Sequence, residues 1–158
     1  MKTMVEAIVK QVEACHKAIL GLCQDVPVAA LTAPALPNGW SVKDTLAHIA
    51  AWDWRCAALL SESYHSNTPL KVHPDVDALN REIYEERQGW SWEEVDSDFR
   101  GAHRALVKAI RELPPARLED VVVRKSIAEE TCEHYQQHFP QLEEWRRQLA
   151  DNLVIKSG

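Results

Sequence analysis

Four segments of the chain carry apolar residues whose spacing alternates between four and three positions. The clearest of these rows consists of Val95, Phe99, Ala102, Leu106, Ala109 and Leu113. Comparable rows run through residues 8–26, 42–60 and 127–149. Such spacing places an apolar stripe along one face of an α-helix, and four stripes can leave water only by packing against one another. The pattern therefore predicts an all-α fold, an antiparallel four-helix bundle.

Pairs of a hydroxyl residue and an acid, three positions apart, indicate where these helices begin. Both side chains of such a pair can hydrogen-bond backbone N–H groups that the first helical turn leaves free. Three serines form pairs of this kind: Ser41 with Asp44, Ser91 with Glu94, and Ser126 with Glu129. We therefore expect the second, third and last long helices to start at these serines.

The segments between the long helices differ in composition. Residues 27–37 contain three prolines, which oppose a regular helix, so we expect a connecting loop there. Residues 65–74 also resemble a loop, whereas residues 75–87 have helical spacing over a short stretch and predict a short added helix. Residues 121–123 are three valines, which are compatible with a brief extended stretch.

The length and charge of the chain indicate how many domains and which partners to expect. A chain of 158 residues has the length of one domain, so we expect residues 1–158 to form a single helical domain. The net charge is -6 and there is no basic cluster, which argues against nucleic acid as a partner. No stretch is apolar for the length of a membrane span, and the first residues do not resemble a signal peptide. We therefore expect a cytoplasmic protein without a membrane partner.

The cysteines of the chain do not form a recognisable motif. Cys15, Cys23, Cys56 and Cys132 show no CxxC spacing and are too sparse for a disulfide scaffold. Because cytosolic thiols normally remain reduced, we interpret them as small buried hydrophobic side chains, with a reactive thiol as the alternative.

Two histidines occupy the apolar row of the last helix. This row consists of Ile127, Thr131, His134, His138, Leu142, Trp145 and Leu149. His134 and His138 are four positions apart, so both rings lie on one helical face and can reach a single divalent cation. The alternative is a core histidine pair satisfied by hydrogen bonds, since an unpaired buried polar group costs about 1–3 kcal/mol. Pro140 follows in the same segment, and we expect a bend just after the pair.

A tight metal site needs a third ligand, and His48 is the best candidate. It lies in the middle of the second long helix, beside the apolar row, where it can face a residue of another bundle helix. Three imidazoles leave positions open for water or substrate, which is typical of a reactive site. The other histidines lack such support and are expected to be solvated: His16, His65, His73 and His103.

The stretches that contain these histidines resemble the DinB/YfiT-like superfamily of bacterial four-helix bundles. They are NGWSVKDTLAHIAAWD, which contains His48, and EHYQQHFPQLEEW, which contains His134 and His138. The stretch DVDALNREIYEER, followed by a capped helix, looks like the ClbS/DfsB branch of that superfamily. The resemblance implies a DinB/YfiT-like bundle, frequent homodimers and a divalent metal site, commonly nickel or zinc, with these three histidines as ligands.

The resemblance implies a range of activities rather than one. Members include thiol-dependent transferases and isomerases, and the ClbS branch includes a hydrolase that opens a reactive cyclopropane of a genotoxin. We identify neither a thiol-cofactor pocket nor a catalytic residue in the sequence. Two hypotheses follow. One is a metal-dependent transferase or hydrolase of small-molecule detoxification or thiol transfer; the other is a non-catalytic protein that binds or sequesters a small molecule without metal.

Five further residues are candidates to line a pocket beside the histidines: Trp52, Asp53, Asn80, Tyr84 and Tyr135. Asp53 interrupts the apolar row of the second helix, so it is a candidate to accept a proton or orient a partner, with a paired buried carboxylate as the alternative. Asn80 and Tyr84 are one turn apart on the short added helix and face either the pocket mouth or solvent. Trp52 and Tyr135 either wall the cavity or pack in the core.

Overall fold

The computed structural model describes the backbone of residues 2–66 and 75–157 and the side chains of residues 4–62 and 75–153. All regular structure in these ranges is helical, which confirms the all-α prediction. The helices are α1 (Lys2–Cys23), α2 (Val28–Thr32), α3 (Val42–Ser66), α4 (Val76–Arg87), α5 (Trp92–Glu112), α6 (Pro115–Glu119), α7 (Val121–Glu130) and α8 (Cys132–Ser157). The loop expected at residues 65–74 falls mostly outside the described residues, because α3 continues through Ser66 and the next described residue is Asp75.

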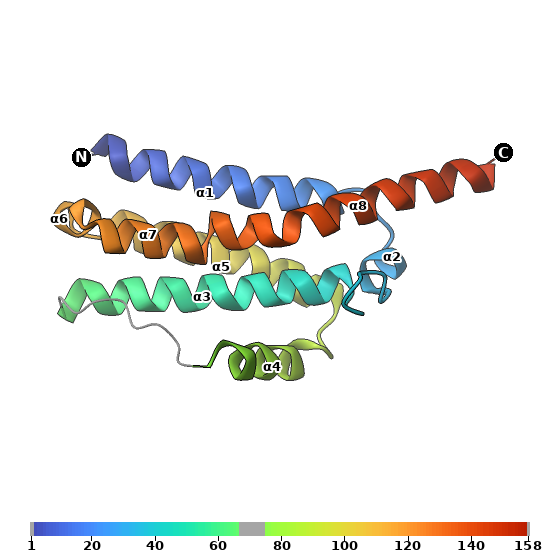
Figure 1. The fold of residues 1–158 in the computed structure, drawn as a ribbon, viewed down its shortest axis with the longest axis horizontal. Coiled ribbons are helices and arrows are strands. Elements are labelled where there is room, and N and C mark those ends of the chain that lie inside the picture. Colours follow the sequence, from blue (N-terminus) through green and yellow to red (C-terminus); the bar gives the residue numbers. More distant parts are fainter. Residues whose placement is uncertain (1, 67–74, 158) are drawn as a thin grey trace.

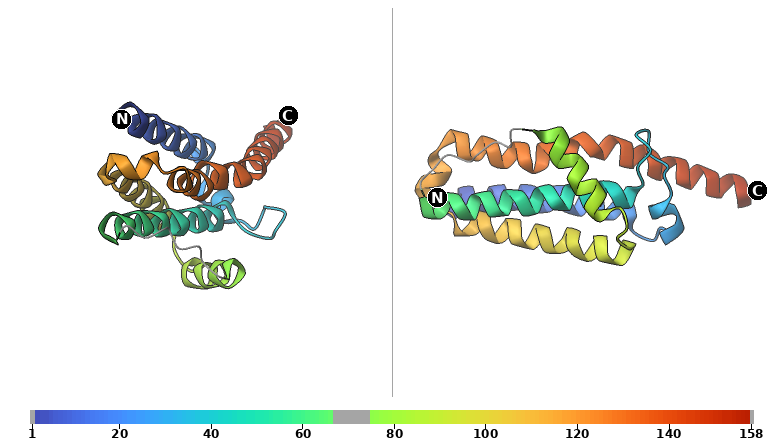
Figure 2. Two further views of the ribbon diagram at one scale, coloured as in Figure 1. Left: turned by 60° about the vertical axis from the view of Figure 1, so that its left-hand side comes forward. Right: turned by 90° about the horizontal axis from the view of Figure 1, so that it is seen from below.

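Four long rods form the body of the molecule: α1, α3, α5, and α7 continued by α8 (Figure 1). α1 packs against α5 and α8, and α3 packs against α5, α7 and α8. Figure 2 shows from a second direction that α4, the short added helix expected from the sequence, lies outside these rods, where it contacts α3. The metal-site candidates therefore belong to two rods that are direct neighbours.

The directions of the rods depend on how the chain connects them. Figure 1 shows α1 and α8 running from left to right, whereas α3 and α5 run from right to left. The neighbours α1 and α5 are thus antiparallel, as are α3 and α8. The neighbours α3 and α5 are parallel, because α4 returns the chain to the end at which α3 began, and the neighbours α1 and α8 are parallel as well. The antiparallel arrangement expected from the sequence therefore holds for only part of the bundle.

Two of the three expected helix starts are confirmed. The Ser41 hydroxyl accepts a hydrogen bond from the Asp44 N–H (3.0 Å), and the Asp44 carboxylate accepts one from the Ser41 N–H (2.9 Å). Ser91 and Glu94 form the same reciprocal pair at the start of α5, at 3.1 and 2.7 Å. Both pairs satisfy N–H groups that the first turn of a helix cannot satisfy itself.

The start expected at Ser126 is wrong. α7 begins at Val121, where the Asp120 carboxylate accepts a hydrogen bond from the Val122 N–H (2.8 Å). Residues 121–123 are consequently helical rather than extended, because Val123 and Ile127, four positions apart, are both buried on one face. The row then breaks at Thr131, whose backbone angles of φ -118° and ψ -100° lie outside the helical region, and α8 starts at Cys132.

Two connections that contain prolines form short helices, α2 and α6. Residues 27–37 were expected to form a connecting loop, but Val28–Thr32 form α2, and its Leu31 is buried. Pro115 opens α6, a position in which the missing N–H of proline costs nothing. α2 and α6 lie at opposite ends of the bundle, and each contributes a buried leucine to its interior.

The interior contains two apolar clusters, each assembled from all four rods. The first includes Ile19, Leu46, Phe99, Tyr135, Leu142 and Trp145. The second includes Val12, Leu60, Leu106, Ile110 and Ile127. Burying one such leucine, isoleucine or phenylalanine side chain contributes about 1.5–3 kcal/mol, so these contacts hold the rods in register.

α8 contains a proline and extends beyond the other rods. Pro140 lies inside α8, which continues as a helix past it. Figure 1 shows that the C-terminal half of α8 leaves the line of the first half and extends beyond the other rods, in agreement with the bend expected at this proline. None of the described helices is both long and apolar enough to cross a membrane.

Candidate metal centre

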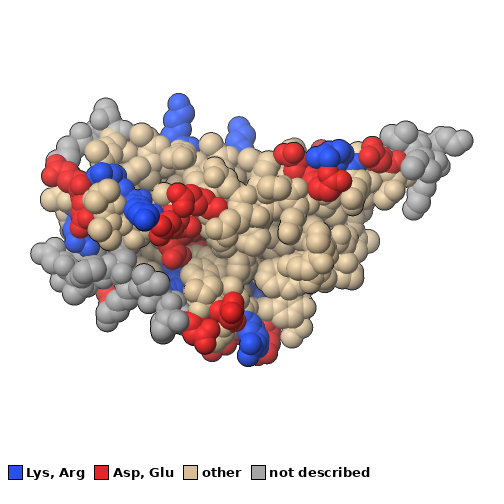
Figure 3. Space-filling model, viewed as in Figure 1, with Lys and Arg blue, Asp and Glu red and all other residues tan. Residues whose placement is uncertain are grey.

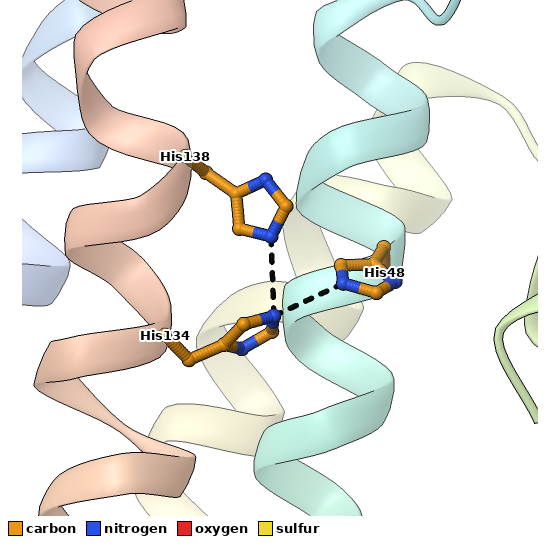
Figure 4. A group of neighbouring side chains, drawn as sticks. All are labelled: His48, His134 and His138. Atoms are coloured by element: carbon orange, nitrogen blue, oxygen red, sulfur yellow. Dashed lines mark hydrogen bonds between the residues drawn. The ribbon is translucent and has the colours of Figure 1, made fainter. Parts of the chain in front are cut away.

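Three histidine rings converge between α3 and α8 (Figure 4). The Nε2 atoms of His48 and His134 are 3.0 Å apart, and those of His134 and His138 are 3.1 Å apart. Each ring offers one nitrogen, and the three nitrogens all lie within 4.8 Å of one another. The structure therefore brings together the three residues proposed as metal ligands from the sequence.

The local sequence explains this convergence. His134 and His138 occupy consecutive turns near the start of α8, so their rings project from the same face. The same row continues through Leu142 and Trp145, which are buried, and this orients the two rings toward the interior. His48 meets them from the middle of α3, between the buried residues Leu46 and Ile49.

Burial keeps the three rings neutral. Desolvation, followed by the charges of His134 and His138, lowers the pKa of His48 to about 3. Desolvation, followed by the charge of His138, lowers the pKa of His134 to about 4, and desolvation also lowers that of His138. Neutral imidazole has a free lone pair on one ring nitrogen, which is the form that binds a metal ion.

The contacts of His134 fit a shared cation well. A ring nitrogen carries either one proton or one lone pair, so His134 Nε2 would have to divide a single hydrogen-bonding capacity between two neighbours. A divalent ion instead accepts one lone pair from each ring. Imidazole nitrogens bind zinc at about 2.0–2.1 Å, so two ligands of one ion lie within about 4.2 Å of each other. The two pairs that include His134 meet this limit, and all three nitrogens lie within 4.8 Å of one another.

A cavity of about 340 Å³ opens over the three rings. It is lined by Asn38, Trp40, His48, Trp52, Val76, Asn80, Glu129, Glu130, His134, Gln137 and His138. The lining residues come from α3, α4, α7, α8 and the segment before α3. Figure 3 shows acidic side chains over the junction of α7 and α8, where the sequence has Glu129, Glu130 and Glu133. A small molecule in this cavity would contact both the histidines and acidic groups.

The five pocket candidates fall in three places. Trp52 and Asn80 line the cavity, and the Trp52 Nε1–H donates to Asn80 Oδ1 (2.9 Å), which ties α4 to α3. Tyr84 stacks on Trp40 with ring centroids 5.6 Å apart, so it supports the cavity wall. Asp53 and Tyr135 are buried in the core, where the Tyr135 hydroxyl donates to the Asp53 carboxylate.

Asp53 has an unusual environment for an acid. Its side chain is fully buried, and burial raises its pKa to about 8, although the hydrogen bond from Tyr135 acts in the opposite direction. Its Oδ1 atom has no hydrogen-bond partner among the described residues. Asp53 is therefore a buried acid that is hydrogen-bonded to Tyr135, and it is not among the residues that line the cavity.

Sequence reasoning missed Trp40 and Glu130. Trp40 directly precedes the capping pair at the start of α3. It belongs to the stretch that resembles the superfamily, but nothing in that stretch indicated that it lines a cavity. Glu130 is four positions before His134, a spacing that indicates a shared helical face, but the break at Thr131 lies between them. Burial raises the pKa of Glu130, while nearby Arg55 lowers it.

The histidines outside the site are not all solvated. His16 is only 6% exposed, and its ring stacks on those of His103 and Phe99 with centroids 3.9 and 4.5 Å away. The expectation of solvation is therefore wrong for His16, because the stack fills the contact between α1 and α5. His103 is half-buried, and the side chains of His65 and His73 lie outside the described residues.

The chain matches the model of a known protein family. The family model described as DinB superfamily matches residues 11–146, a range that contains all three convergent histidines. No curated protein matches the chain.

Proposed function

Because the chain belongs to the DinB superfamily, we propose that it binds one divalent metal ion through His48, His134 and His138 and acts on a small molecule held beside that ion. The observation that carries the proposal is the convergence of three neutral ring nitrogens at one side of a cavity of about 340 Å³. Three protein ligands leave coordination positions for water or substrate, which suits a reactive site.

The donor set favours a borderline transition metal. Imidazole nitrogens suit zinc, nickel and copper better than magnesium or calcium, which prefer oxygen ligands. We propose nickel or zinc. Bound here, such an ion supplies a Lewis acid that polarises an electrophile or lowers the pKa of a water or thiol.

Residues of the chain supply the remaining functions of the site. Trp40 and Trp52 provide apolar walls that limit access of water to the histidines. Glu130 places a carboxyl group in the same cavity, where burial raises its pKa above the ordinary value of a glutamate. A carboxyl group at this position is a candidate to hold or release a proton. The reaction class that we propose is small-molecule detoxification or thiol transfer, by a transferase or hydrolase.

Similarity to the ClbS/DfsB branch remains part of this proposal. It rests on the segment that forms α4, which contributes Val76 and Asn80 to the cavity. An added helix that lines the cavity would give this branch its own substrate preference. We further propose a cytoplasmic protein that forms a single domain and assembles as a homodimer.

Metal analysis of protein purified without an affinity tag tests the proposal. We expect stoichiometric nickel or zinc in the wild type and none in a His134→Ala, His138→Ala double variant. His103→Ala is the matched control, because it removes a half-buried histidine outside the site and should leave the metal content unchanged.

A metal-free wild type that keeps its helical circular dichroism would contradict the proposal. It would favour the second candidate function, a non-catalytic protein that binds or sequesters a small molecule. The observation on which that candidate rests is that each of the two distances, 3.0 and 3.1 Å, taken alone, also fits an N–H···N hydrogen bond between core histidines.

A further inference from the structure

Two cysteines far apart in the sequence meet at the contact between α1 and α8. The thiol of Cys15 hydrogen-bonds to Cys132 Sγ across a distance of 2.7 Å, and the two residues are 117 positions apart. Both are free thiols in this structure. The sulfurs of a disulfide are about 2.0 Å apart, so bond formation requires a closing movement of less than about 1 Å.

The backbone around Cys132 explains its position. Thr131 breaks the helix between α7 and α8, and Cys132 is the first residue after the break. Its thiol also donates to the carbonyl oxygen of Gln11, one turn before Cys15 on α1 (3.4 Å). Cys132 is thereby held against α1, whereas His134 and His138 on the same helix meet α3.

The two thiols differ in accessibility. Cys15 is half-buried, whereas Cys132 is only 5% exposed. Cys23 and Cys56 are buried as well, in the first and second apolar clusters, and the second cluster also contains Cys132. The 2.7 Å sulfur contact, however, joins Cys132 to Cys15. The pair therefore combines the less buried of the two cysteines with a second thiol placed to react with the first.

We propose that Cys15 and Cys132 form a redox-active dithiol that closes to a disulfide on reaction with a low-molecular-weight disulfide. The Cys15 thiolate attacks one sulfur of the small disulfide; a mixed disulfide forms at Cys15, and one small thiolate leaves. The Cys132 thiolate then attacks the Cys15 sulfur and displaces the second small thiolate. Both protein thiols lose their protons to the released thiolates, so two protein thiols are oxidised and one small disulfide is reduced to two thiols.

Tryptic mapping after oxidation tests this proposal. Reduced full-length protein is incubated with oxidised glutathione, free thiols are alkylated, and the protein is digested without reductant. Cleavage after lysine and arginine places each cysteine in a different peptide, with Cys15 in residues 11–17 and Cys132 in residues 126–146. We expect these two peptides to be joined, with loss of two hydrogen atoms.

Single variants separate the two steps. In Cys132→Ser, glutathione should remain attached to the peptide of residues 11–17, because the second thiol is missing. In Cys15→Ser, Cys132 should be alkylated only after unfolding. The matched control is the Cys23→Ser, Cys56→Ser double variant, which should still form the link.

Two results would overturn the proposal. One is a wild type that accumulates glutathione on Cys15 without forming the link, since the sulfurs then do not meet. The other is a link that involves Cys23 or Cys56 in protein whose helical circular dichroism is unchanged. Circular dichroism of every variant ensures that a missing link reflects chemistry in a folded chain.

Discussion

At the scale of single residues, the folded protein holds a proton on Asp53 that the unfolded chain releases. Burial raises the pKa of Asp53 to about 8, whereas an exposed aspartate has a pKa of about 3.9. Between these values the folded state binds one proton more than the unfolded state. The contribution of Asp53 to stability is therefore fully present below about pH 4 and is lost as the pH rises toward about 8.

Replacing Asp53 by asparagine should remove this pH dependence. Asparagine has a similar shape and cannot ionise, so the unfolding free energy of Asp53→Asn should fall less between about pH 5 and about pH 7 than that of the wild type. The difference has an upper limit of about 1.4 kcal/mol per pH unit. Urea unfolding followed by circular dichroism at both pH values measures it.

Tyr135→Phe is the control for Asp53→Asn. It removes the hydroxyl that donates to Asp53 but keeps the carboxyl group, so the fall in stability with pH should remain. Buried histidines such as His16, whose pKa burial lowers to about 3, act in the opposite direction in both proteins and cancel in the comparison. Equal pH dependence in the wild type and Asp53→Asn would contradict the assignment.

Much of the candidate site follows from residue spacing. His134 and His138 were recognisable because two imidazoles four positions apart interrupt an apolar row, and His48 because it lies in the middle of another long helix. The carboxyl group of Glu130 was not recognisable, because its place in the cavity depends on the backbone of Thr131. Spacing shows which residues share a helix face, and tertiary packing decides what that face meets.

At the scale of helices, the three serine–acid pairs provide a comparison within one chain. Ser91 caps α5, whereas Ser126 lies inside α7. Ser91→Ala should therefore lower the unfolding free energy by about 1 kcal/mol, because the Glu94 N–H loses its acceptor. Ser126→Ala should leave stability unchanged or raise it by a few tenths of a kcal/mol, because alanine is the better helix former. Urea unfolding of both variants is the measurement.

Equal losses in Ser91→Ala and Ser126→Ala would show that α7 starts where the sequence motif suggested. The motif failed there because Asp120 caps the helix without an acid three residues later. A single capping side chain is common at loop positions too, so it gives a weaker signal than a reciprocal pair. The starts of α3 and α5 were predictable because a reciprocal pair caps each of them. The start of α7 was not predictable, because a single side chain caps it.

At the scale of the whole molecule, the apolar rows correctly predicted that four helices pack together, but the antiparallel arrangement expected from them holds only for some pairs of neighbours. A stripe of given spacing can pack against a parallel or an antiparallel neighbour. The direction of α5 depends on the return path through α4, a segment whose own apolar row is short. This path leaves α4 beside α3, where Asn80 bonds Trp52 next to His48. The topology thereby adds a wall to the cavity that no single helix supplies.

The proposed ligands also connect distant parts of the chain, since His48 and His134 are 86 positions apart. An ion bound to both α3 and α8 exists only in the folded state, so metal should stabilise the whole bundle. With free zinc or nickel at about one hundred times the dissociation constant, the unfolding free energy should rise by about 2.7 kcal/mol. Urea unfolding with and without the metal measures this rise, and EDTA should reverse it.

Two variants separate the candidate site from other histidines. His138→Ala should lose most of the stabilisation by metal, while His103→Ala should keep it. An equal rise in both variants would mean that the metal binds elsewhere, and that the convergence of the three rings serves packing between α3 and α8 instead.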